Sequence, residues 1–453
     1  MRALFESAKS GMYVAERQLG TTAHNLVNAN TPGYSRQRIE TAPVAVRMGV
    51  GQIGLGVNVT QLTRMRNDLV DTQLMDKRMN MGYLSSKSAI FEQLQSTLAS
   101  DTGGDIDAYV SRVFNAFSNV ASDPQDMSVR NALLAESRQL TDKFHDMNSS
   151  IQVANELVTR NITDDVTQIN GLLKDLASLN QTISSSVAAG KPDYRSMDLQ
   201  GQKLDELSGL VSFEKHVAEN GTLELRVGGI LVVNESKSQQ LRAEIDTDHK
   251  QVYLRLLDNG KVLNPDGGSL AGSIDMYSEE IPDIQNRLDT LAETIVTRFN
   301  ELHQQGFGLD DDFQRTFFDP DGTTAESIKL NPQVTGNLRN IAAASAAGEA
   351  GNGDIAAQIA DVRNEVILDG RKLVDYSIEL ISQPGSRITE LSTTMETRDA
   401  EIRMLEVQQE RESGVNMDEE LGMMIQYQNA YQGSARVLAS AQQMYDTLLS
   451  LIR

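Results

Sequence analysis

The fold is decided by two stretches, FESAKSGMYVAERQLGTTAHNLVN (residues 5–28) and MDEELGMMIQYQNAYQGSARVLASAQQMYDTLLSLIR (residues 417–453). In the first, large apolar residues recur every seven positions, at Phe5, Met12, Leu19 and Leu26. In the second, the same spacing gives Met424, Tyr431, Leu438, Tyr445 and Ile452. A helix with this period carries one apolar seam and is not stable alone in water. We therefore expect the two stretches to be helices that pair with each other and with copies on neighbouring subunits.

Other residues occupy the complementary positions of each seam. They are Ala8, Ala15 and Thr22 in the first stretch, and Tyr427, Ser434, Ala441 and Leu448 in the second. We expect residues 1–33 and 417–453 to form an axial coiled coil that is disordered in the monomer. The alternative is that both seams pack only on the body of the same chain, as ordinary core. In either case, we expect Tyr427, Tyr431 and Tyr445 to be seam residues rather than parts of a ligand-binding cage.

Composition limits the classes of partner. The chain has 453 residues, with 41 Lys and Arg against 63 Asp and Glu, a net charge of -22. So acidic a chain repels nucleic acid and anionic membranes, and neither is an expected partner. No apolar stretch is long enough to span a membrane. Cysteine is absent, and no cleavable signal is visible, which fits a protein exported in an unfolded state.

The residues between the two ends predict a mainly α protein with a β insert. Residues 36–62 alternate as a β-hairpin does, and helical spacing over 34–208 and 266–416 predicts a long helical bundle. Residues 209–265 alternate again, with Gly-containing turns, and predict a small antiparallel β domain. We expect Pro384-Gly385-Ser386 to separate two helices. Since the ends pair, the domains nest into a multidomain rod, with the β insert farthest from the terminal helices.

Motifs for catalysis, nucleotide binding or metal binding are weak in this sequence. Gly49, Gly51 and Gly54 have dinucleotide-loop spacing, but a strand follows where a helix must begin. The five histidines lack zinc-site spacing, and the turn at Asp319 departs from a calcium loop at its sixth position, Thr324. No serine lies in a nucleophile-elbow pattern. We expect no catalytic, cofactor-binding or metal-binding residues, and no enzyme activity.

The turn after the first helix carries a recognisable motif, NANTPGYSR (residues 28–36). Together with SGVNMDEE (413–420) and QYQNAY (426–431), it resembles the signature of the flagellar rod, hook and hook-associated axial proteins. The segments GLGVNV (54–59), RMRNDLVDTQ (64–73) and GGSLAG (267–272) resemble the hook-associated members of that family. The residues that carry the terminal motif are Asn28, Asn30, Thr31, Pro32, Gly33, Tyr34, Ser35 and Arg36.

The resemblance implies a structural subunit of the bacterial flagellum, outside the cell, at the junction between hook and filament. Its implied partners are copies of itself in a helical array, the hook protein, and hook-associated protein 3. It also implies passage through the flagellar type III export channel without a cleaved signal, and a chaperone that holds the C-terminal helix. The alternatives are another axial protein, such as the hook subunit or hook-associated protein 3, or a secreted adhesin or enzyme that uses the β insert.

Overall fold

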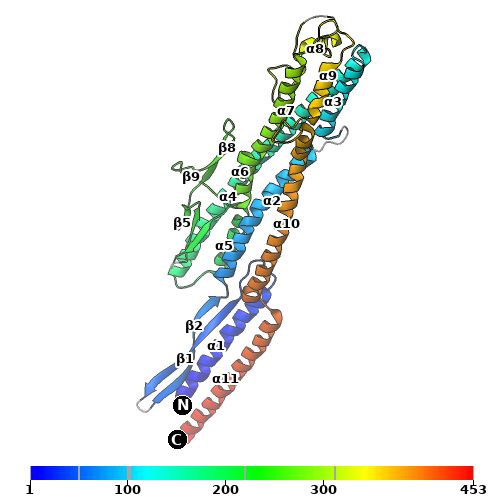
Figure 1. Ribbon diagram of the computed structural model, residues 1–453. Helices are drawn as coiled ribbons and strands as arrows, with labels where there is room; N and C mark the ends of the chain where they lie inside the picture. The colour runs from blue at the N-terminus through cyan, green and yellow to red at the C-terminus, as the bar shows by residue number, and fades with distance from the viewer. Residues whose placement is uncertain (1, 49–50, 99–103, 219–220, 311–312, 452–453) are drawn as a thin grey trace.

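The computed structural model describes residues 2–48, 51–98, 104–218, 221–310 and 313–451. The molecule is a long, mainly helical rod, and both chain ends lie at the same end of it (Figure 1). This confirms the predicted class, a helical bundle with small antiparallel sheets. None of the helices, over the described residues, is long and apolar enough to cross a membrane.

The narrow end of the rod is built from the two terminal helices. Helix α1 (Arg2–Val27) and helix α11 (Met417–Leu451) run antiparallel and side by side, which confirms their predicted pairing (Figure 1). Strands β1 (Gln37–Met48) and β2 (Gly51–Arg64) form the predicted hairpin. Gly49 and Val50 of the expected turn lie outside the described residues, and Gly54 lies within β2 rather than at the start of a helix.

The hairpin packs on α1, whereas the sequence grouped it with the helical rod. The backbone N–H of Val57 donates to Ser10 Oγ at 3.2 Å, so α1 satisfies an edge group of β2. Gly56 has φ of 114° and lies so close to Ser7 and Ser10 that a side chain there would clash. A two-stranded sheet is marginal alone, and this close contact ties the hairpin to the terminal helices.

The rod itself is a bundle of long helices that run up and down its length. Helix α4 has 62 residues and extends about 90 Å. Its N-cap is Asp126, whose side chain accepts from Ser128 N at 2.6 Å. The bundle helices are α2 (Asp68–Leu98), α3 (Ile106–Ser122), α4 (Met127–Ala188), α5 (Tyr194–Leu210), α6 (Gly268–Asp275), the π-helical turn η1 (Met276–Glu280), α7 (Ile281–His303) and α10 (Leu373–Ser413).

Helix α10 corrects the prediction of a break at Pro384, because it continues without interruption from Leu373 to Ser413. Arg287 of α7 donates to Glu379 Oε1 at 3.1 Å and also to Gln383 Oε1, which fixes the turn that precedes Pro384. Pro384 is itself buried against the bundle. The burial and these contacts outweigh the backbone hydrogen bond that a proline removes from a helix interior.

The β insert forms two antiparallel sheets. The first has the order β3 (Glu214–Val217), β4 (Leu223–Val227), β5 (Ile230–Asn234), β6 (Lys237–Ser238), and the second has β7 (Leu241–Asp246), β8 (Gln251–Leu256), β9 (Val262–Leu263). Two asparagines on α4 hold them. Asn180 exchanges hydrogen bonds of 2.7 and 2.8 Å with the backbone of Leu223, and Asn170 does the same with Leu241 at 2.8 and 2.7 Å.

The sequence analysis predicted that the β insert lies farthest from the terminal helices, and the structure corrects this. It flanks the middle of the rod, and the far end is made of α3, α8 (Pro332–Gly336), η2 (Leu338–Asn340), α9 (Asp354–Asp361) and η3 (Val362–Asn364) (Figure 1). The reason is the length of α4. This helix returns the chain from the far end toward the base, so that α5 and the strands begin near the terminal pair.

Candidate assembly interface at the paired chain ends

Small side chains form the contact between α1 and α11. Ala8, Ala15 and Thr22 on α1 and Ala441 on α11 are buried. Gly11 faces Ser434 so closely that an added Cβ would lie 2.7 Å from Ser434 Oγ. Small residues let two helix backbones approach each other, so the larger residues of each seam are left at the flanks of the contact.

The structure places the predicted large seam residues at these flanks. Phe5, Met12, Leu19 and Leu26 on α1, and Met424 and Leu438 on α11, are half-buried. Tyr431 and Tyr445 remain 37% and 53% exposed, and Ile452 lies outside the described residues. Within one chain, the seam residues therefore keep apolar surface that is open to solvent. Their role in assembly stays a prediction.

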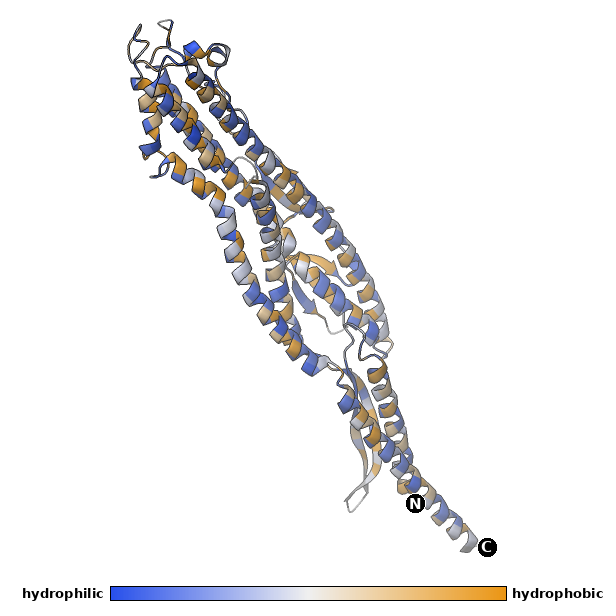
Figure 2. Cartoon of the chain, turned by 90° about the vertical axis from the view of Figure 1, so that its right-hand side faces the viewer, coloured by the Kyte–Doolittle hydropathy of each residue, from blue (hydrophilic) through white to orange (hydrophobic). Residues whose placement is uncertain are grey.

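Helix α11 is longer than its partner. The contacts Asn25–Glu420 and Gly11–Ser434 define one antiparallel register, in which each step up α1 matches one step down α11. The same register sets the start of α1 opposite Gln443. Residues 444–451 therefore extend past the end of α1, and the C-terminus projects beyond the N-terminus in Figure 2. Met444, Tyr445, Leu448 and Leu449 of this projecting tip are about half exposed.

The motif at residues 28–36 forms the turn that leads from α1 into the hairpin. Asn28 Nδ2 donates to His24 O at 2.9 Å, and Thr31 N–H donates to Asn28 O at 2.9 Å. Gly33 takes φ of 71°, a left-handed conformation that other residues adopt only with strain. Pro32 O accepts a hydrogen bond from Gln202 of α5. Asn30 is exposed at the tip of the turn.

A buried hydrogen-bonded cluster joins this turn to both terminal helices. Asn25 Nδ2 donates to Glu420 Oε2 at 3.2 Å, and Asn25 Oδ1 accepts from Tyr34 Oη at 2.7 Å and from Gln37 N at 3.0 Å. Arg36 Nε donates to Glu420 Oε1 at 2.7 Å. Glu420 is fully buried, so its charge depends on Arg36 and Asn25 for compensation. We call Asn25, Tyr34, Arg36 and Glu420 the terminal clamp.

Electrostatics in the clamp favour the neutral tyrosine. Burial raises the pKa of Tyr34, and the carboxylates of Asp198 and Glu420 raise it further. The hydroxyl therefore keeps its proton and can donate to Asn25. Tyr34 Oη also lies 2.9 Å from His24 Nδ1 on the preceding helix. The tyrosine thus links α1 to its own following turn at neutral pH.

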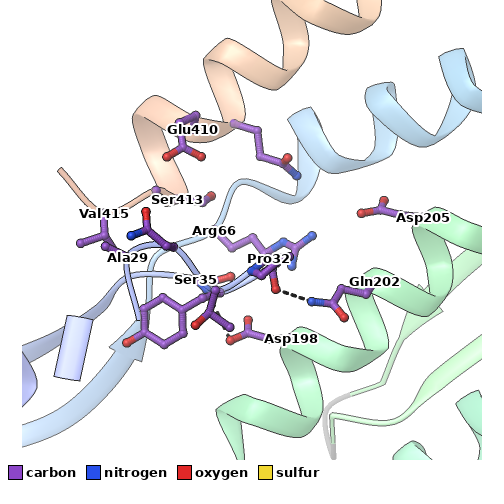
Figure 3. Close-up of a pocket in the computed structure, with 16 residues that line it drawn as sticks. Ala29, Pro32, Ser35, Arg66, Asp198, Gln202, Asp205, Glu410, Ser413 and Val415 are labelled. Atoms are coloured by element: carbon purple, nitrogen blue, oxygen red, sulfur yellow. Dashed lines mark hydrogen bonds between the residues drawn. The ribbon is translucent and has the colours of Figure 1, made fainter. Parts of the chain in front are cut away.

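The turn is also fixed to the rod. Arg36 N–H donates to Ser413 O, the last residue of α10, at 2.9 Å. Asp198 on α5 accepts from Arg64 Nε at 2.7 Å and from Ser35 N at 3.4 Å. Burial lowers the pKa of Arg64, and the neighbouring Arg66 lowers it further, while Asp198 opposes both. Figure 3 shows the pocket of about 270 Å³ that these segments enclose, between the motif turn, α5 and the end of α10.

Sequence reasoning identified the motif but missed several of its partners. Asn25 is buried on α1, but it lies one position before the seam residue Leu26, and the heptad pattern did not single it out. Glu420 lies in the segment SGVNMDEE, but its sequence position is that of an ordinary acidic residue in the first turn of a helix. Asn416 caps α11, because its Oδ1 accepts from the backbone N–H of Asp418 at 3.0 Å. Asp198 is far in sequence from the motif at residues 28–36, and no sequence pattern identifies it as a partner of that motif. Together these groups form a joint between the motif turn, the terminal helices and the rod.

The other chemical motifs contain no built site. Among the described residues, no group of three or more His, Asp or Glu is arranged to hold a metal ion. The five histidines are dispersed. His303 is buried in the far end of the rod, and His145 Nε2 lies 2.9 Å from the backbone oxygen of Ile328.

Comparison with known proteins gives concordant results. Residues 91–318 match the family model described as the flagellar hook-associated protein FlgK helical domain. Residues 408–451 match the C-terminal model of the flagellar basal body rod FlgEFG proteins. The second match contains all of α11, and the first covers half of the chain.

Individual relatives agree. The chain is 25% identical to flagellar hook-associated protein 1 of Salmonella typhimurium, over all of both chains. It is 23% identical to the protein of the same name in Bacillus subtilis, over 98% of this chain and 97% of that one. A solved structure of the flagellar hook junction protein FlgK from Burkholderia pseudomallei shares the fold. Its TM-score is 0.66 at 13% identity, over 74% of this chain and 99% of that chain.

Proposed function

The chain belongs to the flagellar hook-associated protein FlgK family, and we propose that its copies assemble through α1 and α11 at the junction between hook and filament. The family membership replaces the alternatives of a hook subunit, hook-associated protein 3, or a secreted adhesin or enzyme. The protein is a structural component of the bacterial flagellum. We infer that it performs no catalysis.

The observation that carries the assembly role is the apolar surface that α11 leaves open. The helix has 35 residues, and of its described side chains only Glu420 and Ala441 are buried. Ile425 is 61% exposed, and seven further large apolar or aromatic residues of α11 are at least two-fifths exposed: Met417, Leu421, Val437, Met444, Tyr445, Leu448 and Leu449. Exposed apolar side chains in this number along one helix favour an interaction site.

The proposal includes particular partners. Copies of the same chain, the hook protein and hook-associated protein 3 are the expected neighbours in the flagellum. The open face of α11 also suits a chaperone that shields it before export by the flagellar type III system. The absence of cysteine is compatible with export as an unfolded chain. The charge of -22 disfavours nucleic acid and anionic membranes as partners.

The test replaces open apolar residues without disturbing the isolated chain. The variant carries Ile425→Gln, Val437→Gln and Met444→Gln, at positions that are 61%, 42% and 50% exposed. We expect it to be exported and to keep wild-type thermal stability, but to be missing from isolated hook–filament particles and to abolish motility. The measurement is the amount of this protein in purified particles and in the culture medium.

A matched control carries Val153→Gln and Leu257→Gln, on α4 and after β8, where the side chains are 54% and 56% exposed. We expect this control to assemble normally, since those side chains lie away from the terminal pair. Normal incorporation of the α11 variant, with motile cells, would refute assembly through α11.

A further inference from the structure

We propose that the projecting tip of α11 in one copy docks into a hollow at the base of the rod in a second copy. This rests on the proposed assembly function and specifies its contact. The occupant is residues 444–451 of the second copy. The hollow has a volume of about 430 Å³ and lies between the motif turn and α5. Its lining includes His24, Pro32, Tyr34, Arg195, Leu199 and Gln202.

The two surfaces share their chemistry. The tip presents Tyr445, Leu448 and Leu449, all about half exposed. Beside the hollow, Val27 is 83% exposed, the largest value among the large apolar residues described, and Leu199 on the lining is 37% exposed. The apolar side chains of the tip and the exposed Leu199 and Val27 at the hollow both lose unfavourable contact with water when they meet, while most of the other lining residues are polar.

Charge adds a second argument. Asp446 on the tip and Arg195 on the hollow are both exposed, and neither side chain forms an ion pair with another described residue. The hydrogen bond from Ser196 is the main cause of the lowered pKa of the neighbouring Asp193, and the charge of Arg195 acts in the same direction. The hollow is also lined by Asp198, which is paired with Arg64, so Arg195 is the charge that an exposed acid on the tip would meet, and this pair fixes the orientation of one surface on the other.

Geometry excludes docking within one chain. Glu420 lies beside Asn25, at the level of the hollow, and Leu448 lies 28 residues further along the same continuous helix. At 1.5 Å per residue the tip is about 42 Å from its own hollow. The contact therefore joins two copies, and it uses different surfaces on each. Contacts of this kind repeat head to tail, and the rotation between successive copies decides whether they close a ring or build an open helical array.

Cross-linking tests the contact directly, because the chain contains no cysteine. Cells that express Leu199→Cys and Leu448→Cys chains together should yield, from oxidised hook–filament particles, a dimer that requires both variants. A chain that carries both substitutions should yield a ladder of multimers, since every copy is then linked at both ends. A disulfide requires Cα atoms within about 7 Å, so the band reports direct contact.

The control pairs Leu448→Cys with Leu257→Cys, an exposed position on the β insert, and should give no cross-link. Particles that contain the variants but show no 199–448 dimer would overturn the docking while leaving the assembly role intact. A Leu448→Cys product with itself, with the hook protein or with a chaperone instead would overturn it as well. If the cysteine variants are themselves not incorporated into the particles, the docking is tested by charge reversal at Arg195 and Asp446.

Charge reversal provides that measurement without cysteine. Arg195→Glu and Asp446→Arg should each lower incorporation into particles by about tenfold, because each brings like charges together. The double variant, which restores an opposite pair in reversed order, should recover most of the wild-type level. If the double variant is no better than the singles, Arg195 and Asp446 do not meet.

Discussion

At the scale of the residue, the assembly end depends on one buried carboxylate. Glu420 of α11 accepts from Arg36 Nε at 2.7 Å and from Asn25 Nδ2 at 3.2 Å, and its side chain is fully buried. A buried charge without partners is costly, so α11 can dock only where the motif turn presents Arg36. The clamp therefore makes the position of α11 depend on the conformation of the motif.

A second buried group, at the far end of the rod, makes stability depend on pH. His303 is fully buried, its Nδ1 donates to Arg315 O at 2.6 Å, and its Nε2 accepts from Ala342 N at 2.8 Å. Burial lowers its pKa from the usual value to about 4, and Arg130 and Arg315 act in the same direction. Because the folded pKa is below the unfolded one, the stabilisation is present above pH 6.5 and is lost as pH falls toward 4.

We predict that His303→Gln weakens the pH dependence of stability in that window. Between pH 7 and pH 4 the wild type should lose about 3 kcal/mol more unfolding free energy than the variant, measured by urea denaturation. The carboxylates titrate alike in both proteins, so the difference isolates the histidine. His249→Gln is the control, since His249 is largely exposed beside Asp246. Identical losses in wild type and His303→Gln would contradict the assignment.

At the scale of the element, α1 and α11 differ from the rod helices in how they are packed. A long helix in the rod, such as α4, buries large residues along its whole length. The contact between the terminal helices instead buries small residues, and Gly11 lies directly against Ser434. The buried small residues are Ala8, Ala15, Thr22 and Ala441. Such a contact is close but removes little apolar area from water, so the pair is weakly held within one chain. The same arrangement leaves the larger residues available to neighbours.

We predict that Gly11→Leu separates the terminal helices, because a Cβ at that position already meets Ser434 Oγ at 2.7 Å. Amide exchange in α11 around Ser434 should accelerate, and incorporation into flagella should fall. Gly20→Leu is the matched control, since nothing lies within 4 Å of its added Cβ. Both substitutions raise helix propensity by about 1 kcal/mol, so propensity cannot explain a difference between them. Equal exchange rates in the two variants would refute the close contact.

At the scale of the whole molecule, the chain leaves the base through α2, reaches the far end at α3, and returns through α4. It then climbs again through α7 and descends in α10 to the base (Figure 1). This path puts both chain ends at one end of the rod and sets the β insert on its flank. The stable core lies in the rod, and the apolar surface that lacks a partner is concentrated at the terminal end.

We predict that amide protection in the dilute monomer follows this division. Residues 5–28 and 418–453 should exchange much faster than α2 and α4, since local stability follows buried contacts. Incorporation into hook–filament particles should slow exchange in both terminal segments. Protection of α11 in the lone chain that equals the protection of α4 would show that the terminal pair is already complete without neighbours.

The sequence by itself determined the helices at both ends, the hairpin, the helical bundle and the β insert, because each follows from a local period of apolar residues or from a turn. Only the tertiary structure decided the rest. It carried α10 through Pro384, because contacts from Arg287 hold the preceding turn. It set the β insert on the flank of the rod instead of at its far end, because α4 is long enough to return the chain from there. It also brought Asp198 and Glu420 to the motif, because partners 163 and 384 residues away meet only when the chain has folded.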